Sequence, residues 1–410
     1  MKICLLCYRG NPFSGGQGVY AHYLSKELQA MGHDVYVLAG PPYPDLVETV
    51  PLYKLESLGM YDSLRPLHTH LPRLRNPLRL YEFLAVSMGM FPEPLTFSIR
   101  AFLKVRELMS DLKFDVVHDN QCLGYGLLPM KSLNVPVIAT IHHPITIDKK
   151  LAMAQARRPW EKFRLLRWYS FTVMQRLVST RLDRIVTVSH KSAQDIQSDF
   201  KVSKQRLRVV HNGVDANLFQ PDPAIAKRPR NLIAVDSGSS FMKGTHHLLE
   251  ALRLLKGRGN GQVSLTLVGR NGPGSELGAM VRSYGLEDTV VFAGGVDRTT
   301  LVELYSAAAA AVVPSIYEGF GFPAVEAMAC ELPVITTRAG ALPEVVGEDG
   351  LVGIQVPPAD PEALAGAIDR LLSNDQQRKS MGRAGRERVE RCFSWRRAAE
   401  ETVRVYQEVI

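Results

Sequence analysis

Hydrophobic residues along this 410-residue chain recur in short apolar runs, and these runs are separated by longer segments with helical spacing such as residues 19–32. Alternation of buried strands with amphipathic helices is typical of parallel, doubly wound α/β sheets. The runs that we expect to form strands are residues 3–8, 35–39, 116–118, 137–140, 185–188, 231–235, 264–268, 290–292, 308–313 and 334–336.

The length and one break in this pattern predict two domains. A chain of 410 residues is too long for one ordinary hydrophobic core. Residues 217–230 contain three prolines, mixed charge and little apolar periodicity, which is typical of a linker. We therefore expect an N-terminal domain at 1–216, a C-terminal domain at 217–394, and a final helix at 395–410 that packs back on the first domain.

The overall composition is that of a soluble globular protein, with 46% hydrophobic and 22% charged residues. No apolar stretch reaches the roughly 18 residues needed to span a bilayer. The first residues resemble a strand more than a signal peptide, so we expect a cytoplasmic protein. Five scattered cysteines do not make a disulfide framework, and Cys4 and Cys7 lie inside the first apolar run, where we expect packed thiols.

One stretch, residues 314–330, carries the most chemical information and reads PSIYEGFGFPAVEAMAC. Glu318 and Glu326 flank a glycine loop that lies between an expected strand and an expected helix, and Pro323 suits the first turn of that helix. Free backbone N–H groups at the positive end of a helix dipole bind anions. Carboxylates beside such a site accept hydrogen bonds from hydroxyl groups, so this stretch predicts a site for a phosphate and a polyol, as in a nucleotide-sugar.

Three further segments follow expected strands. Lys243, before Gly244, presents a point charge suited to a diphosphate. Gly15 and Gly16 allow a phosphate to approach the backbone, but their spacing does not predict a dinucleotide site. His142 can exchange a proton near neutral pH or donate a hydrogen bond to a hydroxyl, with the adjacent His143 as the alternative. For each segment, a structural turn with solvated side chains remains the other interpretation.

Together these motifs resemble the retaining glycosyltransferases of family 4, and the resemblance covers nearly the whole chain. It implies the GT-B fold, which is an α/β architecture of two Rossmann-like doubly wound parallel-sheet domains facing across a cleft. It also implies that the N-terminal domain binds the acceptor and that the C-terminal domain binds a nucleotide-sugar.

The resemblance also assigns roles to single residues. Glu326 is expected to accept hydrogen bonds from the ribose hydroxyls, and Glu318 to orient the sugar. Lys243 would balance the diphosphate, and His142 would position the acceptor hydroxyl or stabilise charge at the transferred sugar. The other residues expected to contact the donor are Gly15, Gly16, Gly319, Phe320, Gly321, Phe322, Gly269 and Val296.

Two features concern the charge of the diphosphate. The family usually carries an arginine where this chain has Ser237, so either another cation, for instance Arg9 or Arg270, supplies the charge, or backbone N–H groups and hydroxyls suffice. The chain contains no Asp-x-Asp pair, which other glycosyltransferases generally use to hold a divalent metal. We therefore expect a metal-independent reaction and no cofactor, the nucleotide-sugar being a substrate.

Positive charge is concentrated in the first half of the chain. Residues 1–215 hold 28 Lys and Arg against 18 Asp and Glu, whereas the remainder holds 21 against 23. No nucleic-acid motif accompanies this charge, and we expect no nucleic-acid partner. Residues 149–191 hold eleven Lys and Arg, two acids and several large aromatic residues, which suits an anionic membrane surface.

If residues 149–191 are helical, two groups of side chains share opposite faces. The first group would face the membrane and the second would pack on the domain. The first is Trp160, Phe163, Arg164, Arg167, Trp168 and Phe171, and the second is Leu166, Tyr169, Val173 and Leu177.

We therefore interpret the chain as a retaining hexosyltransferase that uses a nucleotide-sugar donor. The acceptor would be a polyol or a lipid-linked or cell-envelope glycan, and the enzyme would be cytoplasmic, with peripheral attachment to the inner face of the membrane as an open possibility. Two alternatives remain: a nucleotide-sugar epimerase of the same fold, and a non-catalytic subunit that binds a sugar nucleotide.

Overall fold

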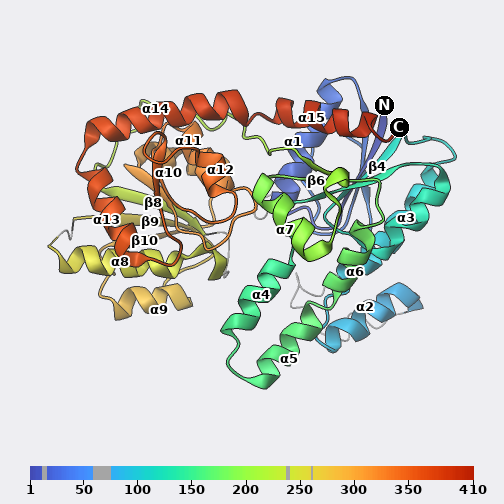
Figure 1. Ribbon diagram of the computed structural model, residues 1–410, viewed down its shortest axis with the longest axis horizontal. Helices are drawn as coiled ribbons and strands as arrows, with labels where there is room; N and C mark the ends of the chain where they lie inside the picture. The colour runs from blue at the N-terminus through green and yellow to red at the C-terminus, as the bar shows by residue number, and fades with distance from the viewer. Residues whose placement is uncertain (12–15, 59–74, 237–240, 260–261) are drawn as a thin grey trace. The chain divides into compact units, whose positions relative to one another are not determined.

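The computed structural model describes residues 1–11, 16–58, 75–236, 241–259 and 262–410, and these form two compact units (Figure 1). The N-terminal unit comprises Met1–Val210 and Ala398–Ile410, and the C-terminal unit comprises His211–Arg397. The division lies six residues before the expected domain boundary at 216. Residues 217–230, the expected linker, contain no helix or strand and belong to the C-terminal unit.

The N-terminal unit contains a seven-stranded parallel sheet in the order β3-β2-β1-β4-β5-β6-β7. Its strands are β1 (Lys2–Cys7), β2 (Asp34–Ala39), β3 (Leu52–Lys54), β4 (Val116–Asn120), β5 (Val137–Ile141), β6 (Arg184–Thr187) and β7 (Leu207–Val209). Its helices are α1 (Gly16–Ala30), α2 (Pro77–Ser87), α3 (Glu93–Leu108), α4 (Thr146–Gln155), α5 (Pro159–Trp168), α6 (Phe171–Ser179) and α7 (His190–Phe200). Ile3 to Cys7 are fully buried, because helices cover both faces of a parallel sheet.

The C-terminal unit contains a six-stranded parallel sheet in the order β10-β9-β8-β11-β12-β13. Its strands are β8 (Asn231–Asp236), β9 (Ser264–Gly269), β10 (Val290–Gly294), β11 (Ala310–Val313), β12 (Val334–Thr337) and β13 (Gly353–Val356). Its helices are α8 (Thr245–Gly257), α9 (Glu276–Ser283), α10 (Arg298–Ala307), α11 (Phe322–Ala329), α12 (Leu342–Val346), α13 (Pro361–Leu372) and α14 (Asp375–Cys392).

The strand order reverses at one point in each sheet. The chain proceeds outward from β1 to β3 and then returns to place β4 beside β1, and in the same way β11 returns to lie beside β8. In open parallel sheets, ligands bind beyond the carboxyl ends of the strands at such a reversal. The segments that follow β1 and β4 in one unit, and β8 and β11 in the other, are therefore the first places to seek a site.

The last helix, α15 (Trp395–Gln407), joins the N-terminal unit from Ala398 onward. Tyr406 is fully buried there, and its hydroxyl lies 2.7 Å from His118 Nδ1 in the centre of the sheet. Figure 1 shows the two chain termini close together as a result.

The basic segment 149–191 differs from our expectation of one helix with two faces. It contains most of α4, then α5, α6, strand β6 and the start of α7, because Pro159 begins a new helix and the chain turns again at Ser170. Our prediction of one continuous helical face across these breaks is therefore wrong. Trp168 and Phe171 belong to the expected exposed face, yet they pack on the Phe91 ring at centroid distances of 5.2 and 5.3 Å.

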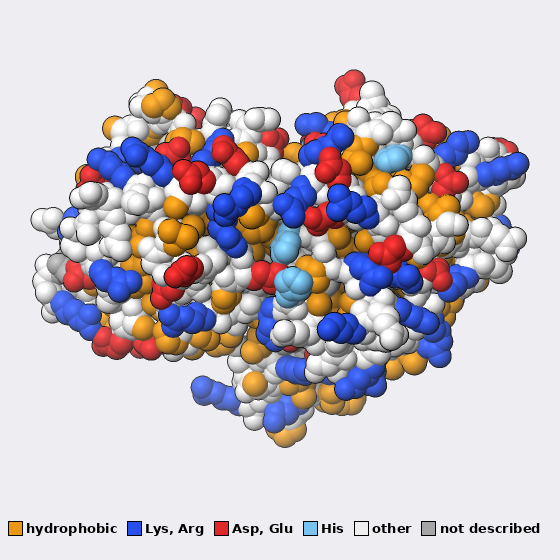
Figure 2. Space-filling model, turned by 45° about the horizontal axis from the view of Figure 1, so that its top comes forward, with side chains coloured by type: hydrophobic (Ala, Val, Ile, Leu, Met, Phe, Trp, Pro, Cys, Tyr) orange, Lys and Arg blue, Asp and Glu red, His pale blue; other side chains and the backbone are white. Residues whose placement is uncertain are grey.

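Other side chains of this segment lie at the surface. Trp160 and Phe163 on α5 are 60% and 59% exposed. Leu166, Val173 and Leu177, which we expected to pack on the domain, are also exposed, and that prediction is wrong. In Figure 2 hydrophobic side chains mix with Lys and Arg on the lower protrusion of the molecule, where Figure 1 draws α4 and α5. No helix within the described ranges is both long and apolar enough to cross a membrane.

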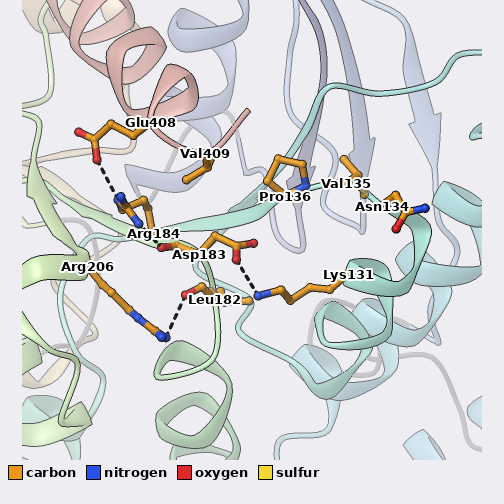
Figure 3. A pocket seen from close by; sticks show the side chains of 10 residues that line it. All are labelled: Lys131, Asn134, Val135, Pro136, Leu182, Asp183, Arg184, Arg206, Glu408 and Val409. Carbon is orange, nitrogen blue, oxygen red and sulfur yellow. Dashed lines mark hydrogen bonds and ion pairs between the residues drawn. The ribbon is translucent and has the colours of Figure 1, made fainter.

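A pocket of about 490 Å³ lies at the edge of the N-terminal sheet opposite to the strand carboxyl ends (Figure 3). It is formed by residues that precede or begin β5, β6 and β7, together with the end of the chain. Four of its charged residues form ion pairs with one another, since Lys131 lies 2.6 Å from Asp183 and Arg184 lies 2.8 Å from Glu408. Its position and its paired charges make it a poor candidate for the site predicted from the sequence.

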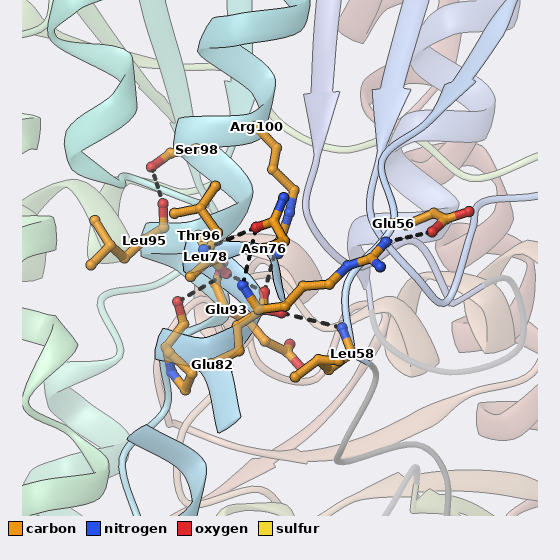
Figure 4. Close-up of polar contacts among 12 residues, drawn as sticks. Glu56, Leu58, Asn76, Leu78, Glu82, Glu93, Leu95, Thr96, Ser98 and Arg100 are labelled. Carbon is orange, nitrogen blue, oxygen red and sulfur yellow. Dashed lines mark hydrogen bonds and ion pairs between the residues drawn. The ribbon is translucent and has the colours of Figure 1, made fainter. Parts of the chain in front are cut away.

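A buried carboxylate joins α2 to α3 (Figure 4). Glu82 is 3% exposed, and its Oε1 accepts hydrogen bonds from Thr96 Oγ1 at 2.6 Å and from Arg100 Nη1 at 2.5 Å. Its Oε2 accepts a hydrogen bond from the Leu58 N–H at 3.2 Å. A buried charge with this many partners fixes the two helices against the chain that follows β3.

The five cysteines are all free, and Cys4 and Cys7 are buried in β1, which confirms our prediction of packed thiols.

Candidate active site

Glu318 and Lys243 meet beyond the carboxyl ends of β11 and β8, at the reversal of the C-terminal sheet. Lys243 ends a single helical turn, η6 (Phe241–Lys243), and its Nζ lies 2.6 Å from Glu318 Oε1. Glu318 is 8% exposed and also accepts a hydrogen bond from Ser315 Oγ at 3.1 Å. The fold thus brings two residues 75 positions apart into one partly buried charge pair.

The backbones of the two loops are in direct contact. The Ile316 N–H donates to the Met242 carbonyl at 2.7 Å, and the Ala341 N–H donates to the Glu318 carbonyl at 2.9 Å. Gly244 has a φ of +65°, and a Cβ at this position would lie 2.0 Å from the Pro314 carbonyl oxygen. Gly244 is therefore required both for its backbone conformation and for the close approach of the loops.

The glycine loop after Glu318 leads into α11. Gly321 precedes the helix with a φ of +104°, and Pro323 occupies its first turn. Within the part of the chain that the structure describes, the N–H groups of Phe320, Gly321 and Phe322 have no hydrogen-bond acceptor. Unpaired N–H groups at a helix N-terminus are suited to an anion.

Glu326 lies on α11, one turn beyond this loop. Part of the side chain reaches solvent, but protein atoms surround the carboxyl group, and this burial raises its pKa from 4.5 to about 7. The positive charge of Arg298 and the Tyr305 hydroxyl, 3.4 Å away, partly oppose that shift. Near neutral pH the carboxyl group is therefore present in both protonation states.

The remaining donor-binding candidates of this unit lie on the same edge of the sheet. Gly269 ends β9 with a φ of +142°, and a Cβ there would lie 1.7 Å from the Asp236 carbonyl oxygen at the end of β8. Val296 follows β10 and is partly exposed. Because β10, β9, β8 and β11 are adjacent and parallel, the residues that follow them share one edge.

His142 follows β5 of the N-terminal unit. Its Nε2 lies 2.8 Å from Asn120 Oδ1, and its ring packs edge to face on Tyr20 at a centroid distance of 4.9 Å. Burial, with a smaller contribution from His143, lowers its pKa to about 3. A neutral imidazole at physiological pH favours the hydrogen-bonding role over proton exchange. His143 Nε2 lies 2.9 Å from Asp148 Oδ2.

Some expected positions lie elsewhere or outside the described residues. Gly16 is the first residue of α1, whereas Gly15 and Ser237 fall outside the described ranges. Arg9, one possible substitute for the missing arginine, lies 3.4 Å from Glu93 in the N-terminal unit. Arg270 is exposed beyond the end of β9. Among the described residues there is no group of three or more His, Cys, Asp or Glu side chains arranged to hold a metal ion.

The sequence analysis missed Asn120 and Gln121. They end β4 and begin the loop after it, beside β1 at the reversal of the sheet, and both hydrogen-bond the His142 segment. The available signal was a run of polar residues, from His118 to Gln121, directly after two buried valines.

Comparisons with known proteins agree with this arrangement. Residues 14–218 match the family model described as Glycosyltransferase Family 4, and residues 220–388 match that of Glycosyl transferases group 1. The MMP alpha-(1->4)-mannosyltransferase of Mycolicibacterium hassiacum is 43% identical over 413 residues, covering 100% of this chain and 98% of that protein.

Two solved structures share the fold. Sucrose-phosphate synthase from Thermosynechococcus elongatus is similar with a TM-score of 0.75 and 24% identity, covering 100% of this chain and 98% of that one. Anabaena HepE, solved in complex with UDP-glucose, is similar with a TM-score of 0.70 and 19% identity, each chain being covered completely.

Proposed function

The chain belongs to the group 1/family 4 glycosyltransferases, and we propose that it transfers a hexose from a nucleotide-sugar to a hydroxyl group of a glycan, with retention of the anomeric configuration. The membership confirms the expected enzyme class, and the two parallel-sheet units confirm the GT-B fold. Nothing favours the epimerase or the non-catalytic subunit.

One observation carries the proposal. The ion pair between Lys243 and Glu318, 2.6 Å apart, lies directly before a glycine loop in which the N–H groups of Phe320, Gly321 and Phe322 have no acceptor among the described residues. A cation and free N–H groups suit a diphosphate, and two carboxylates suit the hydroxyls of sugar and ribose. A nucleotide-sugar presents all of these groups in one molecule.

We assign roles on this basis. Lys243 has three N–H donors, so it can contact a phosphate oxygen while still bonded to Glu318. Glu318 then accepts hydrogen bonds from the sugar, and Glu326 accepts them from the ribose hydroxyls. As the bond to the sugar breaks, negative charge develops on the diphosphate, and Lys243 and the N–H groups of the glycine loop stabilise it.

Mannose is the first sugar to test. The relative that is 43% identical along its whole length carries the name of an alpha-(1->4)-mannosyltransferase. The resemblance of HepE, solved with UDP-glucose, supports a nucleotide-sugar as donor but not the choice of sugar or base. We therefore propose an α-mannosyl donor and a hydroxyl group of a glycan, free or lipid-linked, as acceptor.

A panel of nucleotide-sugars tests the function. The protein is incubated with each donor, with and without short α-linked oligosaccharides, and released nucleotide and extended product are measured by mass spectrometry. We expect turnover of one donor class, loss of that turnover in Glu318→Gln, and normal turnover in Glu303→Gln, an exposed glutamate of the same unit. Equal turnover in both variants, or none in the wild type with any donor, would refute the proposal.

We propose that no divalent metal is needed. Lys243 and the loop N–H groups offer positive charge where the diphosphate would lie, so chelation by EDTA should leave the rate within about twofold of the untreated enzyme. A loss of activity that Mg²⁺ or Mn²⁺ restores would contradict this.

We also propose that the exposed face of α5 attaches the enzyme peripherally to anionic membranes. Arg158 and Arg167 stack over the exposed rings of Trp160 and Phe163 at 4.8 and 5.0 Å. Exposed aromatic rings beside cations suit the headgroup region of an anionic bilayer.

A vesicle-binding assay tests the proposed membrane attachment. Charge reversal at Arg164 and Arg167, both exposed on α5, should reduce binding to vesicles that contain phosphatidylglycerol. The matched reversal at Arg383 and Arg391, exposed on α14, should leave it unchanged. If both variants bound the vesicles as tightly as the wild type, the proposed membrane attachment would be refuted.

A further inference from the structure

Two polar residues after β4 hold the segment that carries His142. Gln121 Oε1 accepts a hydrogen bond from the His142 N–H at 2.6 Å, and Gln121 Nε2 donates one to the His143 carbonyl at 2.9 Å. Gln121 is 3% exposed and has a φ of +58°, which non-glycine residues rarely adopt. A strained conformation persists where surrounding contacts require it, so the backbone at His142 is held in a defined position.

The orientation of the neighbouring Asn120 amide is determined by its surroundings. Asn120 is fully buried, and its Nδ2 donates to the Gln17 carbonyl at 3.0 Å. A carbonyl oxygen only accepts hydrogen bonds, so the nitrogen of the amide must face Gln17. The Nδ2 group also lies 3.8 Å from Cys7 Sγ, a second acceptor. The amide oxygen, Oδ1, therefore faces His142.

This orientation fixes the proton of the histidine. Oδ1 accepts hydrogen bonds and cannot donate them, so His142 Nε2, 2.8 Å away, must carry the hydrogen. In a neutral imidazole the other nitrogen, Nδ1, then has a free lone pair. Nδ1 has no hydrogen-bond partner among the residues that the structure describes.

Tyr20 supports the same ring from another side. Its ring packs edge to face on His142, and its hydroxyl lies 2.9 Å from Thr140 Oγ1 on β5. Thr140 is in turn 2.7 Å from His118 Nε2 in the buried centre of the unit. The imidazole is thus oriented by Asn120, by Tyr20 and by the hydrogen bonds of Gln121 to the backbone of His142 and His143. It lies at the reversal of the sheet, where a ligand is expected.

We propose that Asn120 is a positioning residue: it keeps the proton of His142 on Nε2, which presents Nδ1 as a hydrogen-bond acceptor for a sugar hydroxyl. The same amide links the imidazole to Gln17 at the start of α1, the segment expected to approach the donor phosphate. The inference rests on the proposed function for the presence of the sugar, whereas the tautomer follows from the hydrogen bonds alone. It makes His142 an acceptor, not a donor, toward its substrate.

Nitrogen NMR of the full chain labelled with ¹⁵N-histidine tests the tautomer without any substrate. His142 is assigned by comparison with His142→Gln. At neutral pH we expect Nε2 to resonate as a protonated nitrogen and Nδ1 as an unprotonated one. In Asn120→Ala the two resonances should move toward each other, because the second tautomer becomes populated. A proton on Nδ1 in the wild type, or unchanged resonances in Asn120→Ala, would overturn the proposal.

Kinetics test the consequence. With the donor found by the nucleotide-sugar panel, Asn120→Ala should lower kcat about tenfold, equivalent to one lost hydrogen bond, while KM for the donor changes less than about twofold. Asn217→Ala, an exposed asparagine, is the matched control. An unchanged kcat in Asn120→Ala would contradict the positioning role.

A second variant keeps the test decisive if alanine prevents folding. Asn120→Asp retains an acceptor for the Nε2–H and should keep a single tautomer with the proton on Nε2. Transfer of the proton to Nδ1 in this variant would overturn the inference. If the wild type turned over no donor, the proposed function would fail while the NMR result still decided the tautomer.

Discussion

Replacing Glu318 with glutamine removes one charge from the candidate site and changes little else. The side chain keeps its size and can still accept the hydrogen bond from Ser315 Oγ. What is lost is the ion pair with Lys243 Nζ at 2.6 Å, in which the glutamate side chain is 9% and the lysine side chain 23% exposed.

The expected loss of stability follows from this burial. A hydrogen bond to a charged group contributes about 1.5–3 kcal/mol to the free energy of unfolding. Lys243 is partly solvated, so we expect a loss of about 1–2 kcal/mol and a melting temperature lower by about 2–8 °C for a unit of this size. Differential scanning calorimetry measures both quantities.

We expect Glu318→Gln to preserve or increase the affinity for the nucleoside diphosphate but to lower turnover. Without Glu318, the full charge of Lys243 is available to a phosphate, so affinity for the nucleoside diphosphate should stay the same or rise by up to about tenfold. Turnover should fall by about a hundredfold or more, because the sugar loses the carboxylate that orients it.

Titration calorimetry with the nucleoside diphosphate and a turnover assay at saturating donor measure these two effects. Lys243→Gln is the reciprocal variant and should weaken diphosphate binding by about tenfold or more. A Glu318→Gln protein that binds the diphosphate much more weakly yet turns over at the wild-type rate would refute the reasoning.

Three further predictions concern stability and pH. Burial raises the pKa of Glu326 from 4.5 to about 7, so ionisation of its carboxyl group destabilises the folded state progressively between these pH values and fully above pH 7. Glu326→Gln should therefore raise the free energy of unfolding, measured in urea, by about 2–3 kcal/mol at pH 8 and leave it unchanged at pH 4.5. Gly244→Ala should destabilise the protein by about 3 kcal/mol or more. The control Gly285→Ala, at a residue with a similar φ of +62° but open space around it, should cost only about 1 kcal/mol. Equal losses of stability in the two variants would show that the contact of Gly244 with the neighbouring loop is unimportant. Glu82→Gln should lower the free energy of unfolding by about 3 kcal/mol, because it leaves the Arg100 guanidinium buried without a countercharge; a change below about 1 kcal/mol would contradict this.

The sequence was sufficient to predict most strands, because a parallel sheet covered on both faces requires continuous apolar runs. The sequence was not sufficient to predict strands that are very short or that combine apolar residues with glycine and polar residues. Leu52–Lys54 and Leu207–Val209 have three residues each, and Gly353–Val356 contains a glycine and a glutamine. Pairing with a neighbouring strand defines these elements, and no local pattern reports it.

Helix faces were predictable only within one helix. The expectation for residues 149–191 extended a single periodicity across Pro159 and Ser170, where the chain changes direction. Leu166 and Val173 are exposed as a result, and Phe171 packs on Phe91. Proline at the start of a helix was a visible signal of the first break.

The candidate site was predictable where a motif is contiguous. Glu318, the glycine loop and Glu326 lie within one short stretch, and Lys243 was placed by resemblance. Asn120 was missed because its importance depends on the reversal of strand order, which puts β4 beside β1. The low pKa of His142 was also beyond the sequence, since burial causes it.

The most direct test of the central claim follows the sugar itself. Proton NMR of the reaction with an α-mannosyl nucleotide distinguishes α from β products by their anomeric signals. We predict that mannose appears first in α linkage on the acceptor, and that the Glu318→Gln protein forms no product on the same timescale. A β-linked first product, or transfer by the variant at the wild-type rate, would contradict a retaining transferase built around Lys243 and Glu318.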